Sequence, residues 1–374
     1  MTAQLISISP DATDAPEILA VAKALAEGAI VAFPTETVYG LAANAASGAA
    51  VNRLRDVKGR AATQPFTVHI GRIDECEPFV PTLSNIGRRF IKKGWPGPLT
   101  LIFKVDPSED VPIRPRLSSE GFDAIYSRGS VGVRCPDHVA CASFLTSARV
   151  PVIASSANRA GQAAPVEAAE ILSSIGDEID FVIDSGPTRY RKGSTIVELN
   201  GDGYSIIREG VWDERTIRRL AAVNILFVCT GNTCRSPIAE GLFRNMLARK
   251  IGCDESELPA RGVNVMSAGA ASYGGGRASE YSIEVCRRRG VDISGHVSRG
   301  LSSELVQAAD YIFGMTRSHV DAISAFPLRP STVVAPIAID TEINDPVGGP
   351  LEEYEETARA IELALRKRLH EVTV

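Results

Sequence analysis

The sequence predicts two α/β domains, the first on a mixed twisted sheet and the second on a central parallel sheet flanked by helices. The chain has 374 residues and is 44% apolar, which is too long for one typical core. Short β-branched runs alternate with helical patterns throughout. Several early strands follow one another too closely for an intervening helix, so their sheet cannot be wholly parallel.

Eight short apolar runs are the expected strands of the first half: 29–33, 66–70, 99–105, 131–135, 151–154, 181–184, 194–199 and 204–208. Its expected helices are 15–27, 49–57, 83–92, 139–148 and 166–175. A segment rich in proline, serine and arginine, residues 106–129, is expected to be a mobile loop over a site.

The second half alternates strands and helices regularly, which favours a parallel sheet. Its expected strands are 224–228, 263–267, 309–314 and 332–335, and its expected helices are 237–250, 278–289, 317–325 and 351–370. A short charged stretch without a glycine- or serine-rich tract separates the halves. We therefore expect domains at 1–214 and 223–374 with a short linker, 215–222.

Composition gives little sign of a nucleic-acid or membrane partner. The formal net charge is -5, and acidic and basic residues are interspersed. No run approaches the roughly 18 apolar residues of a membrane span, and the first residues do not resemble a secretory signal. Seven irregularly spaced cysteines fit neither a disulfide framework nor a zinc site. We expect a cytoplasmic protein with no bound metal.

The most specific motif is the loop Cys-Thr-Gly-Asn-Thr-Cys-Arg-Ser, which follows the strand 225–228 and precedes Pro237. Such a loop aims successive backbone N–H groups at one point, where a phosphate can bind. Cys229 is the candidate nucleophile as a thiolate, and Arg235 can hold two phosphate oxygens. The expected phosphate-binding residues are Thr230, Gly231, Asn232, Thr233, Cys234 and Ser236.

Three residues of this loop also have specific expected roles. Gly231 is expected to permit a backbone conformation that a β-carbon would obstruct. Ser236 is either the N-cap of the following helix, or a hydrogen-bond donor to the thiolate, or both. Cys234 either traps Cys229 in a reversible disulfide or is a small filler.

Residues 223–374 resemble the low-molecular-weight protein-tyrosine phosphatases. The resemblance rests on the loop, Ser267–Gly269, Gly290–Asp292 followed by His296, Met315-Thr316 and Asp345-Pro346. It implies that Cys229 takes the phosphoryl group of a phosphorylated protein and that Asp345 protonates the leaving group, without a cofactor. Asp345 is otherwise a turn residue before proline.

The loop with two threonines resembles the protein-arginine phosphatase branch. Thr233 stands where tyrosine-specific relatives usually carry a larger apolar residue, and Val347 replaces a frequent aromatic residue. We therefore expect phosphoarginine to be preferred over phosphotyrosine. An arsenate reductase is the alternative interpretation. Such an enzyme needs a pair of later cysteines that shuttle a disulfide, and Cys253 and Cys286 are not spaced as a pair.

In the first half, polar residues gather at strand ends interrupted by glycine and proline. The informative strings are 34–41, 58–60, 94–100, 132–136 and 156–158, together with His69. They supply fixed cations and small hydroxyl and amide donors, without a Ser-His pair or a metal cluster. That set suits the binding and alignment of two small charged reactants rather than attack by the protein.

Residues 15–210 resemble the YrdC-type threonylcarbamoyl-AMP synthases in every one of these strings. The resemblance implies that L-threonine, bicarbonate and ATP, with Mg²⁺, give threonylcarbamoyl-AMP and pyrophosphate. A separate tRNA-modifying enzyme set then transfers the group to adenosine 37 of tRNA. The implied ATP-binding residues are Lys58, Arg60, Ser130, Ser156, Asn158 and Arg208, and the implied threonine-binding residues are Thr35, His69, Arg134 and Ser194.

Two departures and one alternative accompany this resemblance. Gln64 stands where asparagine is usual, and Val166 where a small hydroxyl is frequent. The alternative is a non-catalytic RNA-binding module, and a tRNA contact stays open. Individually, the arginines could be surface charges and His69 a core histidine.

Overall fold

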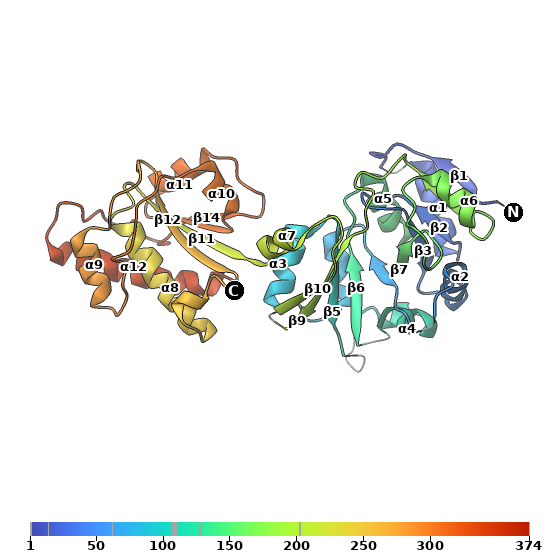
Figure 1. The fold of residues 1–374 in the computed structure, drawn as a ribbon, viewed down its shortest axis with the longest axis horizontal. Helices are drawn as coiled ribbons and strands as arrows, with labels where there is room; N and C mark the ends of the chain where they lie inside the picture. Colours follow the sequence, from blue (N-terminus) through green and yellow to red (C-terminus); the bar gives the residue numbers. More distant parts are fainter. Residues whose placement is uncertain are drawn as a thin grey trace. The chain divides into compact units, whose positions relative to one another are not determined.

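The computed structural model describes residues 2–13, 15–61, 63–106, 111–126, 129–201 and 203–373. It divides into two compact units, residues 1–220 and 221–374 (Figure 1). Helix α7 (Glu214–Ala221) covers most of the stretch expected as a linker, and the division falls within its last turn.

The first unit is built on one ten-stranded sheet in the order β1-β8-β2-β3-β7-β4-β6-β5-β9-β10. Antiparallel pairs such as β5 with β6 mix with parallel pairs such as β5 with β9, which confirms the predicted mixed sheet. The strands are β1 (Gln4–Ser7), β2 (Val31–Phe33), β3 (Gly40–Asn44), β4 (Thr67–His69), β5 (Leu99–Lys104), β6 (Ser130–Arg134), β7 (Val152–Ser156), β8 (Phe181–Asp184), β9 (Thr195–Asn200) and β10 (Gly203–Arg208).

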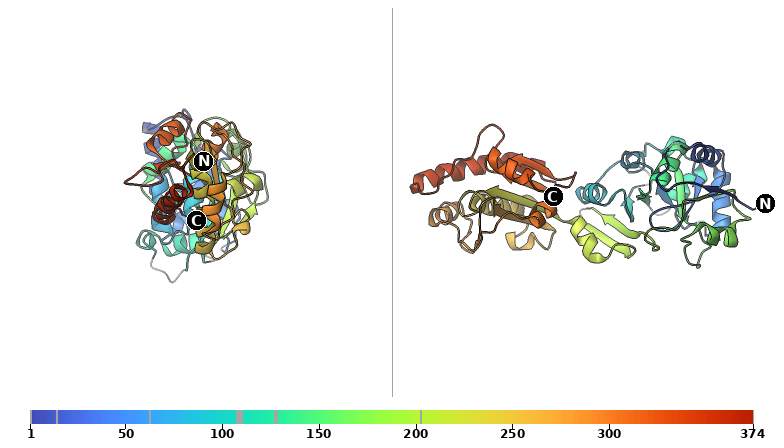
Figure 2. Two further views of the ribbon diagram at one scale, coloured as in Figure 1. Left: turned by 90° about the vertical axis from the view of Figure 1, so that its left-hand side faces the viewer. Right: turned by 90° about the horizontal axis from the view of Figure 1, so that it is seen from above.

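The helices of this unit are α1 (Pro16–Ala26), α2 (Gly48–Lys58), α3 (Asn85–Gly94), α4 (Ser119–Tyr126), α5 (Val139–Ala148), α6 (Ala168–Ile175) and α7, with short 3₁₀ turns at Ile73–Phe79 and Arg114–Arg116. Figures 1 and 2 show them around the sheet. The apolar face of α1, with Ile18, Val21 and Leu25, packs with Phe144 of α5 into one buried cluster. Burial of each such side chain contributes about 1.5–3 kcal/mol.

The ends of α2 place two cations of the first unit. Ser47 caps the helix by accepting the Ala50 N–H, and Gly59 ends it with a left-handed φ of 59°. Glycine adopts this conformation at little cost, so the chain turns sharply there. Lys58 is consequently the last helical residue, and Arg60 follows the turn.

Some elements differ from the sequence predictions. The segment expected to be a loop contains α4, and β1, β3 and α10 were not expected. All five residues of β3 are buried and three of them are Gly or Ala, so the strand lacks both alternation and β-branched residues.

The second unit has a four-stranded, wholly parallel sheet in the order β12-β11-β13-β14, as predicted. Its elements are β11 (Val223–Cys229), α8 (Arg235–Ile251), a 3₁₀ turn (Glu255–Glu257), β12 (Val263–Gly269), α9 (Glu280–Arg287), α10 (Ser303–Ala308), β13 (Tyr311–Gly314), α11 (Arg317–Ser324), β14 (Val333–Pro336) and α12 (Leu351–Glu371).

Alternate residues of β11 enter two different cores. Ile225 and Phe227 join the cluster formed with α8, α9 and α12, whereas Leu226 and Val228 join the cluster formed with α10 and α11. Figure 1 shows α8 and α12 on one side of this sheet and α10 and α11 on the other. Since β11 is central and covered on both faces, its carboxyl end is a rigid support for the loop that follows.

Candidate functional site

Strand register places three polar side chains of the first unit in one row. His69 of β4 pairs with Arg134 of β6, which pairs with Thr100 of β5. Paired residues of neighbouring strands point to the same face of a sheet, so these three side chains line one surface. They border a cavity of about 200 Å³.

Arg134 is the centre of a buried hydrogen-bond network. Its Nη2 donates to Glu36 Oε1 at 3.0 Å and to the hydroxyls of Thr37 at 2.6 Å and Thr35 at 3.4 Å. The Arg134 and Glu36 side chains are only 6% and 1% exposed. Thr35 in turn donates to the Val38 carbonyl at 2.7 Å, so the turn before β3 is tied to the arginine.

His69 is a neutral imidazole in this site. Burial, and then the nearby charge of Arg134, lower its pKa from 6.5 to about 3. Its Nδ1 lies 3.1 Å from the Thr67 carbonyl oxygen, which can only accept. Nδ1 therefore carries the proton, and Nε2 is left as an acceptor.

Two cations stand at the end of α2. Lys58 Nζ donates to the carbonyl oxygens of Ser156, at 2.5 Å, and of Asn158. Burial, and then the charge of Arg60, lower the Lys58 pKa from 10.5 to about 8. Arg60 donates to Gln64 Oε1 at 3.2 Å and lies over the Phe66 ring.

The opposite wall comes from the strands β9 and β10. Arg208 donates to the Ser194 carbonyl at 2.8 Å, and the hydroxyls of Ser194 and Thr100 are 2.9 Å apart. Burial, and then Arg134, lower the Arg208 pKa from its usual value.

Six of the expected site residues line the cavity: Arg60, His69, Arg134, Ser156, Ser194 and Arg208. Thr35, Lys58 and Asn158 lie behind them, joined by the hydrogen bonds just described. Ser130 begins β6 four residues before Arg134, about 13 Å along the strand, and is not among the described lining residues.

The other lining residues were given no role from the sequence, among them Tyr39, Thr100, Ser155 and Gly193. Tyr39 and Thr100 lie inside strings that the sequence singled out, whereas Ser155 carried no signal of its own. The Ser155 hydroxyl is buried without a hydrogen-bond partner within the described structure. Ser155 thus leaves a polar group for a ligand to satisfy.

The second site is the loop between β11 and α8. The Asn232 N–H donates to Cys229 Sγ at 3.2 Å, and Ser236 Oγ lies 3.0 Å from the same sulfur. The Asn232 side-chain amide donates to Ser236 Oγ at 2.9 Å. The Ser236 hydroxyl proton is therefore free to be donated to the sulfur. The N-cap of α8 is Cys234, so the N-cap reading of Ser236 is wrong.

Asn232 fixes the backbone conformation of the loop. It has a left-handed φ of 58° and is fully buried. Its amide also donates to Ser267 Oγ at 2.8 Å and accepts the Arg299 N–H at 2.8 Å. These bonds stabilise a backbone conformation that is uncommon outside glycine.

The glycine that the loop requires is not Gly231. A β-carbon at Gly231 would meet only Thr233 Oγ1, at 3.5 Å, and its φ is not left-handed. At Gly269, the last residue of β12, a β-carbon would lie 2.6 Å from the Thr230 carbonyl oxygen. The expected role of Gly231 is thus wrong, because the close approach is made by a neighbouring strand.

Arg235 connects the loop to the segment before α12. Its Nη2 donates to an Asp345 carboxylate oxygen and to Thr230 Oγ1 at 3.3 Å, and its Nη1 donates to the Ile343 carbonyl at 3.2 Å. Asp345 also accepts the Val347 N–H at 3.3 Å, as a turn residue does. The geometry therefore places Asp345 in a turn and beside the loop at once.

Cys234 lies apart from these contacts. Its Sγ is 3.5 Å from Tyr354 Oη and 3.6 Å from Ser279 Oγ, and the residue is 5% exposed. All seven cysteines are free thiols in the structure. The packing of Cys234 against Tyr354 agrees with the hypothesis that it is a small filler. It does not test whether Cys234 forms a reversible disulfide with Cys229.

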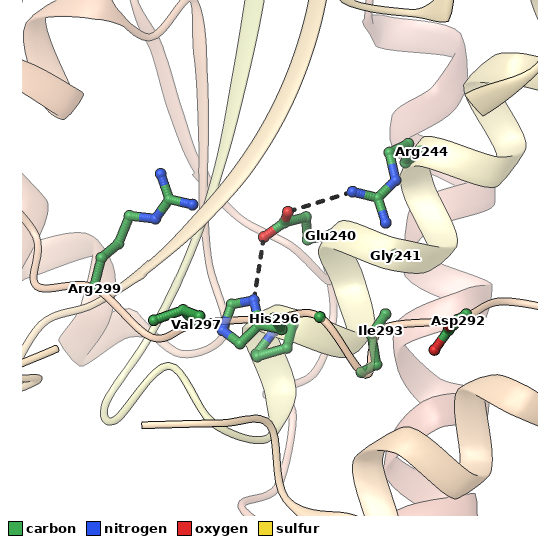
Figure 3. A pocket seen from close by; sticks show the side chains of 10 residues that line it. Glu240, Gly241, Arg244, Asp292, Ile293, His296, Val297 and Arg299 are labelled. Carbon is green, nitrogen blue, oxygen red and sulfur yellow. Dashed lines mark ion pairs between the residues drawn. The ribbon is translucent and has the colours of Figure 1, made fainter. Parts of the chain in front are cut away.

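A separate pocket of about 370 Å³ lies beside α8 (Figure 3). Figure 3 shows Glu240 between Arg244 and His296, with separations of 3.7 and 3.9 Å. His296 Nε2 lies 2.9 Å from the Asn232 carbonyl oxygen, and Glu240 accepts the Ser267 hydroxyl at 2.6 Å. Neither Glu240 nor His296 was assigned a role from the sequence, yet both support Asn232.

The part of the chain that the structure describes holds no group of three or more His, Cys, Asp and Glu side chains placed to bind a metal. Nor does any described helix combine the length and hydropathy needed to cross a bilayer.

Two family models match the chain. The model Sua5_yciO_yrdC, described as "Telomere recombination", matches residues 23–210. The model of low molecular weight phosphotyrosine protein phosphatases matches residues 224–373. The two matches fall within the two structural units.

Individual relatives resemble the first unit. A threonylcarbamoyl-AMP synthase of Bacillus subtilis is 33% identical over 53% of this chain and 54% of its own length. A putative threonylcarbamoyl-AMP synthase of Mycobacterium tuberculosis is 31% identical over 55% of this chain and 90% of its own length. The chain thus spans about half the length of the first of these relatives.

Among solved structures, P. abyssi Sua5 complexed with L-threonine superposes with a TM-score of 0.51 and 20% identity. The match covers 97% of this chain and 98% of that one. At this identity the likeness shows the fold alone.

Proposed function

The chain belongs to the Sua5_yciO_yrdC family, and we propose that its first unit makes threonylcarbamoyl-AMP and pyrophosphate from L-threonine, bicarbonate and ATP. The observation that carries the proposal is the cavity in which His69, Arg134 and Ser194 meet Arg60 and Arg208. Several fixed cations around one cavity suit a reaction whose substrates are all anionic or zwitterionic.

Threonine and ATP, two of the three substrates, bind at different parts of the cavity in this proposal. Arg134 and the hydroxyl of Ser194 bind the threonine carboxylate, and neutral His69 offers an acceptor for its amine or hydroxyl. The cations Lys58, Arg60 and Arg208 bind ATP together with Ser156 and Asn158. Ser130, about 13 Å along β6 from Arg134, contacts a part of the nucleotide away from the threonine. Arg134 is already held by Glu36, so it is preorganised when threonine arrives.

Mg²⁺ would enter with the triphosphate rather than as a resident ion. Magnesium usually keeps several waters and binds one or two carboxylates besides substrate phosphates. None of the described residues that line the cavity is acidic, and Glu36 is paired with Arg134. The residues of this site therefore fit an ion carried by ATP, which would neutralise phosphate charge.

Pyrophosphate release in the presence of threonine, bicarbonate and ATP tests the synthase. We expect release by the full chain and its loss in Arg134→Met, with Arg53→Met as the control because Arg53 pairs with Asp180 away from the cavity. RNA binding without any pyrophosphate release would instead establish the RNA-binding module. The product would pass to a transferase that modifies adenosine 37 of tRNA.

For the second unit we propose a cysteine-dependent protein phosphatase. The Cys229 thiolate attacks phosphorus while the bond to the leaving group breaks, and Asp345 donates a proton to the departing atom. Water then attacks the thiophosphate while the Asp345 carboxylate takes its proton, which releases inorganic phosphate and the free thiolate and restores the acid. The supporting observation is that the Asn232 N–H and the Ser236 hydroxyl both face the sulfur.

Phosphoarginine is the substrate we favour over phosphotyrosine. Thr233 puts a hydroxyl where a bulkier apolar side chain would form a wall, and Val347 is 67% exposed rather than an aromatic partner for a ring. Thr233→Ile should move the ratio of turnover from phosphoarginine towards phosphotyrosine peptides. A wild-type preference for phosphotyrosine, or an unchanged ratio in the variant, contradicts this preference.

Arsenate reduction is less well supported than phosphatase activity. Burial raises the pKa of Cys286 to about 12, so this thiol is a poor nucleophile for a disulfide shuttle. Arsenate-dependent oxidation of a thiol reductant by the full chain would support an arsenate reductase instead.

A further inference from the structure

Thr230 has a hydrogen-bond pattern that the phosphatase mechanism above does not use. Its Oγ1 lies 3.0 Å from His319 Nε2 and 3.3 Å from Arg235 Nη2. The side chain is exposed at the start of the loop, next to Cys229. The direction of each of these bonds can be worked out from the partners.

The tautomer of His319 is fixed by a backbone group. The Thr316 N–H donates to His319 Nδ1 at 3.2 Å, and the Thr316 hydroxyl, which can also donate, lies 2.7 Å from the same nitrogen. A nitrogen that accepts the backbone N–H cannot carry a proton itself. Burial, and then the charge of Arg235, lower the His319 pKa, so the ring stays neutral. The one ring proton is therefore on Nε2, and His319 donates it to Thr230.

Arg235 can only donate as well, so Thr230 Oγ1 accepts two hydrogen bonds. Both lone pairs of the hydroxyl are then occupied. Its own proton must be directed elsewhere, and Thr230 lies on the exposed side of the loop. A phosphoryl oxygen bound beside the adjacent Cys229 would be an acceptor for this proton.

We propose that His319 is a positioning residue, which forces the Thr230 hydroxyl to donate to a phosphoryl oxygen bound in the loop. This inference rests on the proposed phosphatase function. His319 does not touch the substrate and acts through Thr230. A hydroxyl that could rotate freely would spend part of its time as an acceptor, which repels a phosphoryl oxygen.

The test compares four single variants and one double variant of the full chain. Thr230→Val removes the donor and keeps the shape, His319→Ala removes the positioning bond, and His319→Gln restores an N–H near the place of Nε2. Ser324→Ala is the control, because Ser324 is exposed on the same helix and donates to the Val320 carbonyl rather than to the turn that holds His319. The readouts are kcat, KM, the Kd of inorganic phosphate and Tm.

We expect Thr230→Val to weaken phosphate binding and kcat/KM on the order of tenfold to a hundredfold, as loss of a hydrogen bond to a charged group does. His319→Ala should approach that loss, His319→Gln should recover most of it, and Ser324→Ala should match the wild type. The double variant Thr230→Val/His319→Ala should be no worse than Thr230→Val alone.

Additive losses in the double variant, or a Thr230→Val enzyme equal to the wild type, overturn the inference. Should His319→Ala fail to fold, His319→Gln and Thr230→Val still decide it. If the wild type binds phosphate but hydrolyses no phosphopeptide, the proposed phosphatase activity is wrong. The phosphate Kd values then still judge the role of His319.

Discussion

Arg235 and Asp345 lie 110 residues apart in the sequence, yet the guanidinium of one donates directly to the carboxylate of the other. Arg235 is 5% exposed and Asp345 is 38% exposed. The arginine is thus part of the loop floor, while the carboxylate reaches it from the solvent side. If phosphate binds in the loop as proposed, it should compete with Asp345 for the same guanidinium.

This competition predicts that Asp345→Asn lowers kcat but strengthens the binding of inorganic phosphate. Loss of a general acid should lower kcat on the order of a hundredfold to ten-thousandfold for peptides with poor leaving groups. Inorganic phosphate should bind more tightly, because Arg235 no longer has a carboxylate partner. Steady-state kinetics and product inhibition measure both effects, and Asp340→Asn is the control, since Asp340 pairs loosely with Lys367. Weaker phosphate binding in Asp345→Asn would contradict the competition.

The donors to sulfur predict the reactivity of Cys229. Cys229, Cys141 and Cys286 are all buried, but burial raises the pKa of Cys141 and of Cys286. At neutral pH, iodoacetamide should therefore label Cys229 ahead of the other two, and phosphate should protect it. Ser236→Ala removes one donor and should slow the labelling and the turnover by roughly tenfold or more. Mass spectrometry of the labelled peptides measures the rates. Labelling of Cys229 only in strongly alkaline buffer would remove the basis for a thiolate mechanism.

Lys58 predicts a pH dependence of ATP binding. Its pKa is about 8, so ATP affinity should fall as the pH rises through 8 and the ammonium charge is lost. Lys58→Met should bind ATP weakly without this fall, and Lys104→Met, which removes a surface pair with Glu198, should behave as the wild type. Calorimetric titration across this range checks both. A wild-type affinity that stays flat to pH 10 would exclude Lys58 from the triphosphate site.

The lowered pKa of Lys58 also affects the stability of the fold, which should increase with pH where the ATP affinity decreases. Between about 8 and 10.5 the folded chain has released the Lys58 proton while the unfolded chain still holds it. The contribution of Lys58 to the free energy of unfolding therefore rises with pH across that window and is lost as the pH falls through 8. Urea titrations of the wild type and Lys58→Met, compared at both ends of the window, measure this difference.

The close packing at Gly269 predicts that an alanine there abolishes the phosphatase activity but not the activity of the first unit. A β-carbon there would meet the Thr230 carbonyl at 2.6 Å, so Gly269→Ala should shift the loop and cost about 1–3 kcal/mol of stability. Phosphatase activity should be lost, while the synthase of the separate unit should be kept. Gly295→Ala is the matched control, because nothing lies within 4 Å of its added carbon. An active Gly269→Ala enzyme would show that the loop tolerates displacement.

The sequence was most informative where chemistry is local. The loop from Cys229 to Ser236 is contiguous, and its strand and helix were predicted on both sides. Most strands were also found, because β-branched runs bounded by turn residues mark them. The strand β3 was missed because a strand buried on both faces and built of Gly and Ala has no period to detect.

The remaining features depend on contacts distant in the sequence. The need for glycine at 269 arises from the Thr230 carbonyl of the neighbouring strand's loop, so Gly231 looked like the better candidate. Similarly, Thr100 joins the synthase cavity only through the register of β4, β6 and β5. His319 received no role because its ring reaches the loop from α11, 89 positions away.

The position of β9 and β10 at one end of the ten-stranded sheet has a consequence for the chain during synthesis on the ribosome. Until residues 195–208 have been translated, β5 has no neighbour on that side, and its Leu99, Leu101 and Phe103 belong to an open edge. Unpaired apolar edges recruit strands from other molecules. Prematurely terminated products that stop short of β9 should therefore aggregate, whereas in those that reach α7 strand β5 is paired with β9 and the edge is formed by the largely exposed strand β10.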